Sequence, residues 1–577
     1  MKNSSTSLYT LTLTILTLVI SIEFAHGGDP PSKRYMVAAA NPHAVAAGLK
    51  ILQEGGSATD ATIAAQMVLT LVEPQSSGIG GGAFLLHYQS SKTLPKGDPI
   101  IEAYDGRETA PKSVTPSLFL DKKGKKIPWK LRKAGGKGVG VPGVLRMLEL
   151  AHKRHGKLPW NRLFGPAISL AKNGFRVTPR LHALIKRDRH LANFPNTRKF
   201  FYSKKGLALP IGHRLKNPIL ANTLRKIAEK GPIAFYTGPV AKDIMIAVNS
   251  TQHLPGKITL ADISSYEAKV RKALCTQYRE WKVFGMPPPT SGGIAISQIL
   301  TMLERFDFSQ IPAGSAKAVH LIAEASKLAF ADRNHYVADS DFVNVPASKL
   351  LDRNYLVRRS KLISPYKVIG KAKPGIIVDY SEPKLTSDYG ENRPISTSHI
   401  SVVDHDGNAV SMTTSIGTAF GSRLMVRGFM LNDELTDFSP FPNLNGKLVA
   451  NRVEPGKRPR SSMAPTIITA KDGKLVMTIG SPGGSSIIGY VTKTIIAALD
   501  WNMTMQNAIA LPNFVNKNRK TELEKGSNLE KIAPKLRRMG HKIKIRNKTS
   551  GLHGIRVRPN GYEGGADPRR EGLAIGE

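Results

Sequence analysis

A threonine at the head of a predicted strand is the first candidate for chemistry in this chain. Thr397 stands before the strand-like run from His399 to Val403, and an Asp406-Gly407 turn leads into a second run, 409–416. Asp-Gly between two β-branched runs predicts a β-hairpin. If the chain were cut before Thr397, a free α-amine would stand beside the threonine hydroxyl. One residue would then hold both a nucleophile and a base.

A glycine-rich turn offers a second candidate. Gly480-Ser-Pro-Gly-Gly484 lies between a predicted strand and a predicted apolar helix. Glycines allow a ligand to approach the backbone closely, and amides at a helix N-terminus favour negative charge. The turn could therefore form an oxyanion hole for acyl transfer. An ordinary strand-to-helix turn explains the same residues equally well.

A third group of residues could recognise the head of an amino acid. Arg107 could clamp a carboxylate with two parallel hydrogen bonds, and the adjacent hydroxyls of Ser461 and Ser462 could bind the same carboxylate. Glu434 and Asp437, three residues apart, could face an ammonium group. Together the five side chains would read a zwitterion, although each alone is more typical of a surface residue or a polar turn.

The elements that must position these residues alternate between helix and strand patterns. Helices are predicted over 42–52 and 61–72, a glycine loop over 76–82 and a strand over 84–88. The region 139–250 is predicted to be mainly helical, and 260–284 to contain a short strand pair. The later predicted elements are helices over 290–303, 320–337 and 485–500 and strands over 464–470 and 475–480. Strand pairs with helices on their faces favour a layered α/β or α+β domain.

The segment from Pro374 to Pro394 is punctuated by proline and glycine and is predicted to be an exposed linker. It lies just before Thr397, where a cleaved bond should be. His399 could serve as a base, but its alternation within the strand favours a structural role.

Composition narrows the class of protein. The 577 residues include 41% apolar and 22% charged residues, as in ordinary globular proteins. The single cysteine, Cys275, excludes an internal disulfide and cysteine-based zinc spacing. Gly138 to Gly143 matches GxGxxG, but no clear strand precedes it and Pro142 interrupts it. We therefore expect no cofactor and no metal.

The net charge of +40 is spread along the chain in patches, such as 122–126, 187–189 and 537–538. Neither zinc-finger spacing nor an aromatic RNA-binding run accompanies it, so we expect a solvated basic surface and no nucleic-acid partner. A basic protein that binds polyanions without catalysis is the alternative from another class.

The N-terminus is typical of an export signal. Lys2 precedes an apolar stretch from Leu8 to Ile22, and Ala25-His26-Gly27 supplies small residues for cleavage after Gly27. The stretch is short for a membrane span. We expect residues 1–27 to be a signal peptide and the protein to be periplasmic or secreted; an uncleaved N-terminal anchor is the alternative.

Taken together, these segments resemble the γ-glutamyltranspeptidase (glutathione hydrolase) family of N-terminal-nucleophile hydrolases. The resemblance runs from about residue 35 to residue 573. The matching segments are 41–42, 56–60, 76–84, 107–108, 141–143, 288–293, 397–404, 432–438, 457–465, 480–484 and 565–570.

The resemblance implies an α+β fold, a four-layer αββα sandwich made as one proenzyme. Self-cleavage before Thr397 would give a large subunit, 28–396, and a small catalytic subunit, 397–577, within one intertwined fold. It implies an enzyme, a γ-glutamyltransferase and glutathione hydrolase. Thr397 would take the γ-glutamyl group from glutathione or related amides and pass it to water, an amino acid or a dipeptide.

The resemblance also assigns roles to residues. The amine of Thr397 would act as the base, Ser415 would support the nucleophile, and Gly483 and Gly484 would supply the oxyanion donors. Arg107, Ser461 and Ser462 match positions that hold the substrate α-carboxylate. Glu434 and Asp437 match positions that hold its α-amine.

Gly417 departs from the family pattern, because many members carry an asparagine or glutamate there that contacts the substrate amine. Losing one hydrogen bond to a charged group would cost about 1.5–3 kcal/mol of binding. An acylase of the same fold but different acyl specificity is therefore a rival, either cephalosporin-acylase-like or a poly-γ-glutamate hydrolase. Kinetics of a Gly417→Asn variant would test the idea.

Overall fold

The computed structural model describes residues 32–93, 99–378, 380 and 396–577. The predicted signal peptide and most of the predicted linker lie outside these residues. Two antiparallel β-sheets form the centre of the described chain. The first contains, in spatial order, β22 (Leu573–Gly576), β1 (Met36–Ala39), β9 (Ser398–Val403), β10 (Ala409–Ser415), β2 (Gly82–Gln89), β3 (Ile100–Gly106) and β6 (Lys269–Lys272). The second contains β21 (Gly561–Ala566), β20 (His553–Arg558), β16 (Leu475–Gly480), β15 (Thr466–Thr469), β8 (Trp281–Gly285) and β7 (Leu274–Tyr278).

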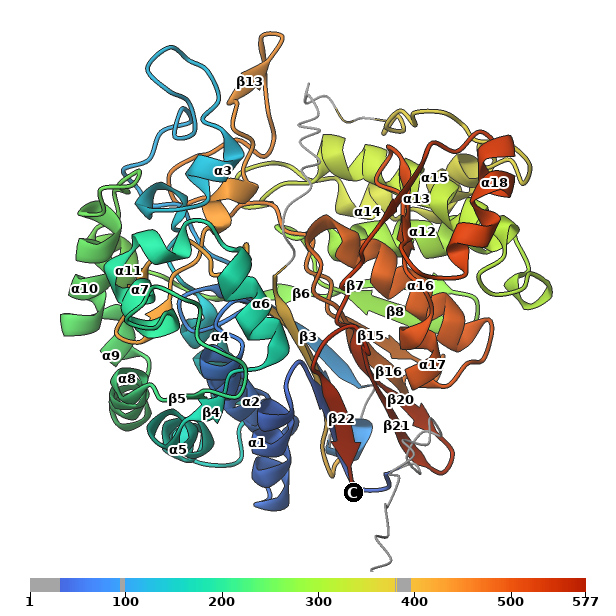
Figure 1. The fold of residues 1–577 in the computed structure, drawn as a ribbon. Helices are drawn as coiled ribbons and strands as arrows, with labels where there is room; N and C mark the ends of the chain where they lie inside the picture. Colours follow the sequence, from blue (N-terminus) through green and yellow to red (C-terminus); the bar gives the residue numbers. More distant parts are fainter. Residues whose placement is uncertain (1–31, 94–98, 379, 381–395) are drawn as a thin grey trace, which may run out of the picture. The chain divides into compact units, whose positions relative to one another are not determined.

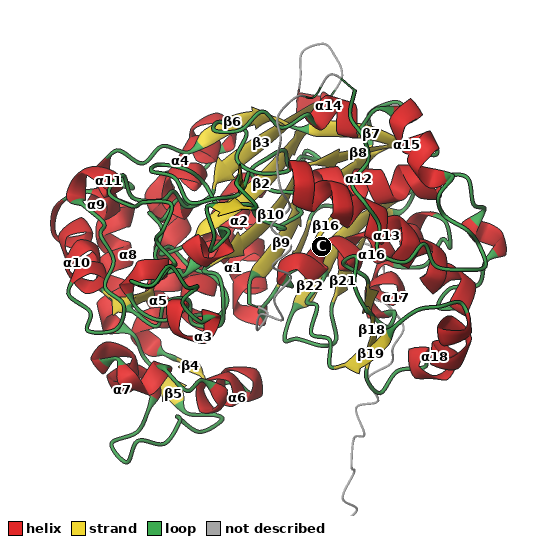
Figure 2. Cartoon of the chain, turned by 90° about the horizontal axis from the view of Figure 1, so that it is seen from above, coloured by secondary structure: helices red, strands yellow, loops and turns green. Residues whose placement is uncertain are grey.

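The two sheets pack face to face, and helices cover both outer faces. Along β1, Val37 and Ala39 join the apolar cluster of the first helical layer, whereas Met36 and Ala38 join the cluster formed with the second sheet. This alternation follows from the two-residue period of a strand. Figures 1 and 2 show α1, α2 and α4 on one side of the sheets and α12, α13 and α16 on the other. The predicted four-layer αββα sandwich is confirmed.

The first helical layer begins with α1 (Pro42–Gln53) and α2 (Ala58–Val72), both close to their predicted ranges. Ser57 and Asp60 form a capping box that starts α2 three residues before the predicted start. The other helices of the large region between β3 and β6 are α3 (Trp129–Arg132), α4 (Val144–His155), α5 (Gly165–Asn173), α6 (Pro179–Arg187), α7 (Pro195–Phe201), α8 (Pro218–Lys230), α9 (Ile233–Tyr236), α10 (Gly238–Asn249) and α11 (Leu260–Ser264).

The second helical layer is built around α12 (Gly292–Leu303), α13 (Ala316–Tyr336) and α16 (Ile487–Leu499). Shorter helices accompany it: α14 (Ala347–Leu350), α15 (Arg353–Ser360), α17 (Met505–Ala510) and α18 (Leu529–Arg538). The remaining short strands are β4 (Phe175–Arg176), β5 (Arg214–Leu215), β11 (Met425–Val426), β12 (Phe429–Met430), β13 (Asn443–Leu444), β14 (Lys447–Leu448), β17 (Phe514–Val515), β18 (Thr521–Glu524) and β19 (Ile543–Arg546). Within the described ranges, no helix is both long and apolar enough to cross a bilayer.

One expectation about the strands was incomplete. The region 260–284 contains three strands rather than a pair, because β6 joins the first sheet while β7 and β8 pair in the second. Both sheets also combine strands from before and after Thr397. In the first sheet, for example, β9 lies between β1 and β10, and β10 pairs with β2. The chain on either side of Thr397 is therefore interleaved.

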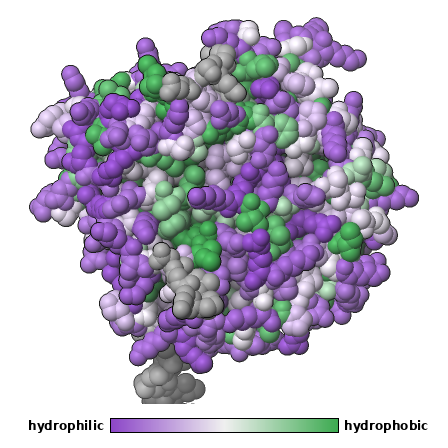
Figure 3. Space-filling model, turned by 180° about the vertical axis from the view of Figure 1, so that it is seen from behind, coloured by the Kyte–Doolittle hydropathy of each residue, from purple (hydrophilic) through white to green (hydrophobic). Residues whose placement is uncertain are grey.

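The basic surface is largely as expected. The lysines of 122–126 are exposed, as are Arg187, Arg189, Arg537 and Arg538. Hydrophilic side chains cover most of the face seen in Figure 3. The basic residues at 457–460 differ, because Lys457 is fully buried and Arg458 and Arg460 nearly so. Their charged groups lie inside the protein, and the same segment leads into Ser461 and Ser462 of the candidate site.

Candidate active site

Thr397 stands at the entrance to β9 and is held at three points. Its amide donates to the carbonyl of Ser76 at 3.1 Å. Its hydroxyl donates to Ser415 Oγ at 3.1 Å, and its carbonyl oxygen accepts from Arg570 Nη1 at 2.9 Å. The residue before it, Ser396, donates from its hydroxyl to the carbonyl of Gln75. The candidate nucleophile is therefore buried and fixed in one orientation.

The backbone of Thr397 is strained. Its φ is +105°, in a region that a β-branched residue adopts only at a cost of about 1–3 kcal/mol. The angle φ is defined by the peptide bond to Ser396. A cut at that bond would release the constraint, so the strain favours cleavage there.

Ser415, at the end of β10, connects the nucleophile to the residues predicted to bind substrate. Its oxygen accepts from the Thr397 hydroxyl and from the amide of Gly417 at 2.9 Å. Its side chain also lies near Glu434 and acts to lower the pKa of that carboxyl. Because the oxygen already accepts from two donors, its remaining hydrogen-bonding capacity is its own proton.

Arg107 lies among carboxylates at the end of β3. Its Nη1 is 2.7 Å from Glu434 Oε2 and 3.3 Å from Glu108 Oε2, and its Nη2 is 2.6 Å from Asp437 Oδ2. Its Nε donates to the carbonyl of Pro459 at 3.1 Å. The structure thus brings Arg107, Glu434 and Asp437 together, as the zwitterion hypothesis requires. Glu108, which was not among the predicted site residues, is the third carboxylate.

Keeping all three buried carboxylates ionised around one guanidinium would be energetically unfavourable, because the negative charges outnumber the positive one. Burial raises the pKa of Glu108 well above its ordinary value, and the nearby Glu434 raises it further. Burial also raises the pKa of Glu434 to about 7; Asp437 and Asp433 act in the same direction, and Arg107 opposes them. Burial alone would lower the pKa of Arg107, but the three carboxylates outweigh it and raise that pKa, so the guanidinium stays charged. The cluster therefore holds at least one proton near neutral pH.

Ser461 and Ser462 are anchored by their neighbours. Ser461 donates from its amide to the carbonyl of Pro289 at 3.1 Å, and its carbonyl accepts from the amide and hydroxyl of Ser291 at 3.0 and 2.7 Å. The hydroxyl oxygen of Ser462 accepts from Arg333 Nη2 at 2.7 Å. Arg107 contacts the carbonyl of Pro459, two residues before Ser461, so the structure brings the serine pair near Arg107.

The glycine turn lies close to the start of β9. Gly480 packs so tightly on His399 that a Cβ would collide with the ring, and Pro482 and Arg570 both lie against Gly551. Gly483 and Gly484 have φ of +144° and +54°. Among the described residues, neither amide donates a hydrogen bond to an acceptor. Both donors thus remain available for an oxyanion.

Gly417 plays a different structural part from the one expected from sequence. Its φ is +94°, and a Cβ there would collide with Asp433 Oδ1. Asp433 in turn accepts from the amide and hydroxyl of Thr418 at 2.8 and 2.6 Å. Any side chain at 417 must displace Asp433, so a Gly417→Asn variant would change the loop as well as add an amide.

His399 has a structural environment. Its Nδ1 is 2.9 Å from Thr413 Oγ1 and its Nε2 is 3.1 Å from Ser401 Oγ, and it is fully buried. Burial holds the pKa of His399 well below its ordinary value. Both ring nitrogens are occupied by neighbouring strand residues, so the histidine supports the hairpin.

One cluster has the residue types of a metal site. His320 and Glu324 on α13 lie with His541 so that their donor atoms are within 4.8 Å of one another. His320 Nδ1 is, however, 2.8 Å from His541 Nε2, a hydrogen-bond distance, and Lys327 Nζ is 2.7 Å from Glu324 Oε1. The lysine already neutralises the only carboxylate of the cluster, so the cluster is complete without a cation.

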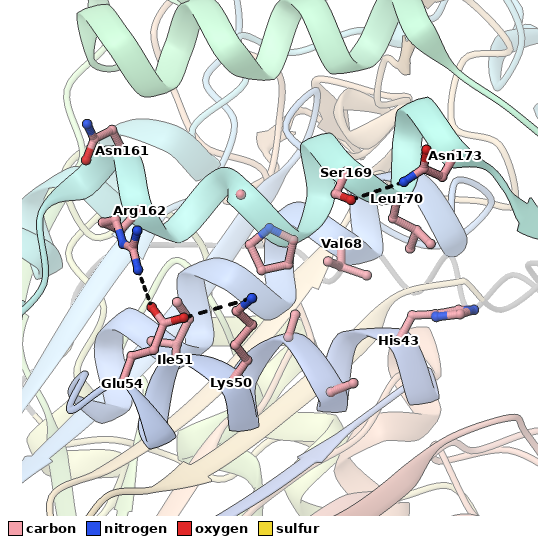
Figure 4. A pocket seen from close by; sticks show the side chains of 14 residues that line it. His43, Lys50, Ile51, Glu54, Val68, Asn161, Arg162, Ser169, Leu170 and Asn173 are labelled. Carbon is pink, nitrogen blue, oxygen red and sulfur yellow. Dashed lines mark hydrogen bonds and ion pairs between the residues drawn. The ribbon is translucent and has the colours of Figure 1, made fainter.

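A surface cavity lies between α1 and α5 (Figure 4). Glu54 in it is 3.0 Å from Arg162 and 4.0 Å from Lys50. None of the predicted site residues lines this cavity. It is therefore separate from the Thr397 site.

Several residues that hold the site were not predicted from sequence. Ser76 and Arg570 fix the backbone of Thr397, Glu108 adds charge beside Arg107, and Arg333 binds Ser462. Gly565 to Arg570 carried part of the family resemblance, which was the only signal for Arg570. Ser76 and Glu108 also lie in segments that carried the resemblance, 76–84 and 107–108. Arg333 is linked to the site only by a contact over more than a hundred residues of sequence.

A helix–sheet–sheet–helix stack with a buried threonine heading a central strand defines the class of N-terminal-nucleophile hydrolases. Residues 44–577 match the sequence model of the family described as Gamma-glutamyltranspeptidase. The chain is 36% identical to the glutathione hydrolase proenzyme of Bacillus subtilis (strain 168), over 100% of this chain and 99% of that protein. It is 37% identical to the glutathione hydrolase proenzyme of Escherichia coli (strain K12), over 93% and 91%. The chain therefore belongs to the γ-glutamyltranspeptidase family.

The fold is also similar to that of a solved structure whose name indicates a different substrate. The crystal structure of cephalosporin acylase from Bacillus halodurans superposes with a TM-score of 0.82, covering 100% of this chain and 99% of that chain, at 26% identity. The fold is thus shared by proteins named for different acyl substrates, and specificity must come from the side chains around Thr397.

Proposed function

We propose that this protein is a self-processing γ-glutamyl hydrolase and transferase. Two observations carry the proposal: Thr397 donates a hydrogen bond to Ser415, and the nearby Glu434, whose pKa Ser415 acts to lower, forms an ion pair with Arg107. The nucleophile thus lies close to groups suited to the head of an α-amino acid. The relatives named glutathione hydrolase support glutathione as the donor.

The first step is cleavage of the chain. The Thr397 hydroxyl attacks the carbonyl carbon of Ser396, the bond from that carbon to the Thr397 nitrogen breaks, and the nitrogen takes up a proton. The resulting ester is hydrolysed by water, which leaves a carboxylate on Ser396 and restores the hydroxyl. The strained φ of Thr397 and its fixed backbone support attack at this bond.

The second step uses the new amine. The α-amine of Thr397 removes the proton from the hydroxyl, which attacks the γ-carbonyl carbon of the donor. The amides of Gly483 and Gly484 would stabilise the oxyanion. The carbon–nitrogen bond of the donor breaks, the leaving amine takes the proton, and the γ-glutamyl ester remains on Thr397. Water releases glutamate, whereas the amine of an amino acid or dipeptide releases a new γ-glutamyl amide.

Recognition of the donor rests on charge. Arg107 and the hydroxyls of Ser461 and Ser462 would hold the α-carboxylate, and Glu434 and Asp437 would hold the α-ammonium. In the unliganded protein Arg107 pairs with Glu434 and Asp437. A zwitterion brings one charge of each sign and can satisfy both partners without leaving an unpaired charge buried.

The intact mass of the purified protein under denaturing conditions tests the processing step. Wild type should give two chains, the second beginning at Thr397, and Thr397→Ser should do the same because it keeps a hydroxyl. Thr397→Ala should stay a single chain. If wild type also stays uncut, the proposal is wrong.

A set of matched anilides tests the acyl specificity. γ-Glutamyl 4-nitroanilide carries both charged groups, glutaryl 4-nitroanilide lacks the amine, and 4-aminobutyryl 4-nitroanilide lacks the carboxylate. We expect the first to be cleaved fastest. Faster cleavage of the glutaryl compound would favour the second candidate, an acylase, which Gly417 and the fold similarity to a cephalosporin acylase support.

We also propose that the protein is exported. The apolar stretch from Leu8 to Ile22 and the small residues up to Gly27 support a cleaved signal. N-terminal sequencing of the protein made in its own host should begin at Gly28. A start at Met1 in membrane fractions would instead indicate an uncleaved anchor.

A further inference from the structure

Arg333 binds one of the two predicted carboxylate-binding serines directly and the other through a relay. It lies in the last turn of α13 and is 9% exposed. Its Nη2 donates to Ser462 Oγ at 2.7 Å, and its Nε donates to Ser291 Oγ at 2.8 Å. The Ser291 hydroxyl then donates to the carbonyl of Ser461 at 2.7 Å.

Hydrogen bonds within the described residues occupy a lone pair on the hydroxyl oxygen of each serine of the pair and leave its proton unused. A serine hydroxyl has one proton to donate and two lone pairs that accept. Ser462 Oγ accepts from Arg333, and Ser461 Oγ accepts from the amide of Met463 at 3.1 Å. Neither hydroxyl donates to any acceptor in the described part of the chain. Both protons therefore remain available for an acceptor that a ligand brings, such as a carboxylate.

The guanidinium is itself held in place. Arg460, next to the serine pair, donates from Nη1 to the carbonyls of Arg333 and Val337 at 3.2 Å each. The end of α13 is thereby tied to the backbone that carries Ser461 and Ser462. A third contact, from Arg333 Nη1 to Asn334 Oδ1 at 2.8 Å, fixes the far side of the guanidinium.

We propose that Arg333 is a positioning residue that makes Ser462 a hydrogen-bond donor to the α-carboxylate of the γ-glutamyl donor. This proposal rests on the proposed function and adds a specificity determinant to it. The hydrogen bond from the guanidinium to Oγ polarises the hydroxyl and strengthens the bond that the hydroxyl donates. Arg333 acts on the donor through Ser462.

The test compares two substrates that differ in the carboxylate alone. Arg333→Met should raise the KM for γ-glutamyl 4-nitroanilide about tenfold with little change in kcat, because one charge-supported hydrogen bond is lost. The 4-aminobutyryl anilide has no carboxylate, so the variant should cleave it with an unchanged kcat/KM. Arg333→Lys keeps the charge with a single donor group and should give an intermediate KM. Arg353→Met is the matched control, because the exposed Arg353 side chain pairs with Glu304, away from the site.

A double-mutant cycle provides a second readout. If Arg333 acts through Ser462, adding Arg333→Met to Ser462→Ala should cause no further rise in KM. Additive effects, or an equal loss on both anilides, would overturn the proposal and leave Arg333 a purely structural residue. If Arg333→Met does not fold, the same comparisons made with Arg333→Lys decide the question. Failure of the proposed function is distinguishable, since wild type would then show neither processing nor anilide cleavage.

Discussion

Arg570, close to the C-terminus, donates a hydrogen bond of 2.9 Å from its Nη1 to the carbonyl oxygen of Thr397. The cation is therefore a close neighbour of the atom that becomes the α-amine after cleavage. Burial and the nearby Arg180 together lower the pKa of Arg570 to about 9, so the guanidinium is still charged at neutral pH.

The first prediction concerns the α-amine of Thr397, the proposed catalytic base. A cation beside an amine lowers the pKa of that amine from its ordinary value of about 7.7–8.0, which keeps more of it in the neutral, basic form. Arg570→Gln should therefore move the acidic limb of the kcat/KM profile upward by about one pH unit. The comparison requires processed enzyme, so cleavage should be checked first by mass. An unchanged limb in fully processed variant would show that Arg570 does not influence the base.

The second prediction concerns donor binding and pH. The pKa of Glu434 is raised to about 7, so below that pH the free protein holds a proton on this carboxyl. An ammonium group favours the ionised form, so binding must release the proton, and the KM for γ-glutamyl 4-nitroanilide should fall as pH rises from about 6 to 8. Glu434→Gln cannot titrate and should bind more weakly, with no such pH dependence. A wild-type KM that stays constant across this range would contradict the assignment.

The third prediction concerns Gly417. Alanine at Gly417 meets both an unfavourable φ and the Asp433 carboxylate, whereas alanine at Gly212 meets the same kind of φ with open space around it. Gly212→Ala should cost about 1 kcal/mol. Gly417→Ala should cost about 1–3 kcal/mol more, because atoms must move to make room. Denaturant unfolding measures the free energy of unfolding of both variants. Equal losses of stability would show that the Asp433 side chain moves aside at no energetic cost.

The fourth prediction concerns the cut protein. Because β9 pairs with β1 and β10 pairs with β2, strands from both sides of the Ser396–Thr397 bond hydrogen-bond along their lengths. The two chains should elute together in size-exclusion chromatography without denaturant and separate only when unfolded. The uncut Thr397→Ala protein gives the reference elution volume. Two separate peaks in native buffer would show that the interleaving does not hold the pieces together.

Much of the local structure could be predicted from sequence. The Asp406-Gly407 turn predicted the β9–β10 hairpin, and the apolar run from Ala61 to Val72 predicted α2 to within a few residues. These features depend on neighbouring residues. The proximity of Arg107, Glu434 and Asp437 was inferred from a chemical idea and then found in the structure. Their roles with substrate stay predictions.

The rest depended on topology. Arg333 and Ser462 are 129 residues apart, and no local pattern indicates that one binds the other. The basic run from Lys457 to Arg460 reads as a solvated patch, yet Lys457 meets Glu454 and the Ala450 carbonyl inside the protein, and Arg460 caps α13. β6 was missed because its exposed residues do not form an apolar strand and only its pairing with β3 identifies it.

The contacts that hold Thr397 make the proposed self-cleavage depend on correct folding. Ser76 from the segment before the cut, and Ser415 and Arg570 from the segment after it, must all be in place to hold Thr397. A misfolded copy cannot assemble them and so never gains its free amine. Destabilising substitutions far from the site should lower the yield of cut molecules, while each molecule that is cut keeps its full turnover rate. Only correctly folded molecules would thus be cut and become active.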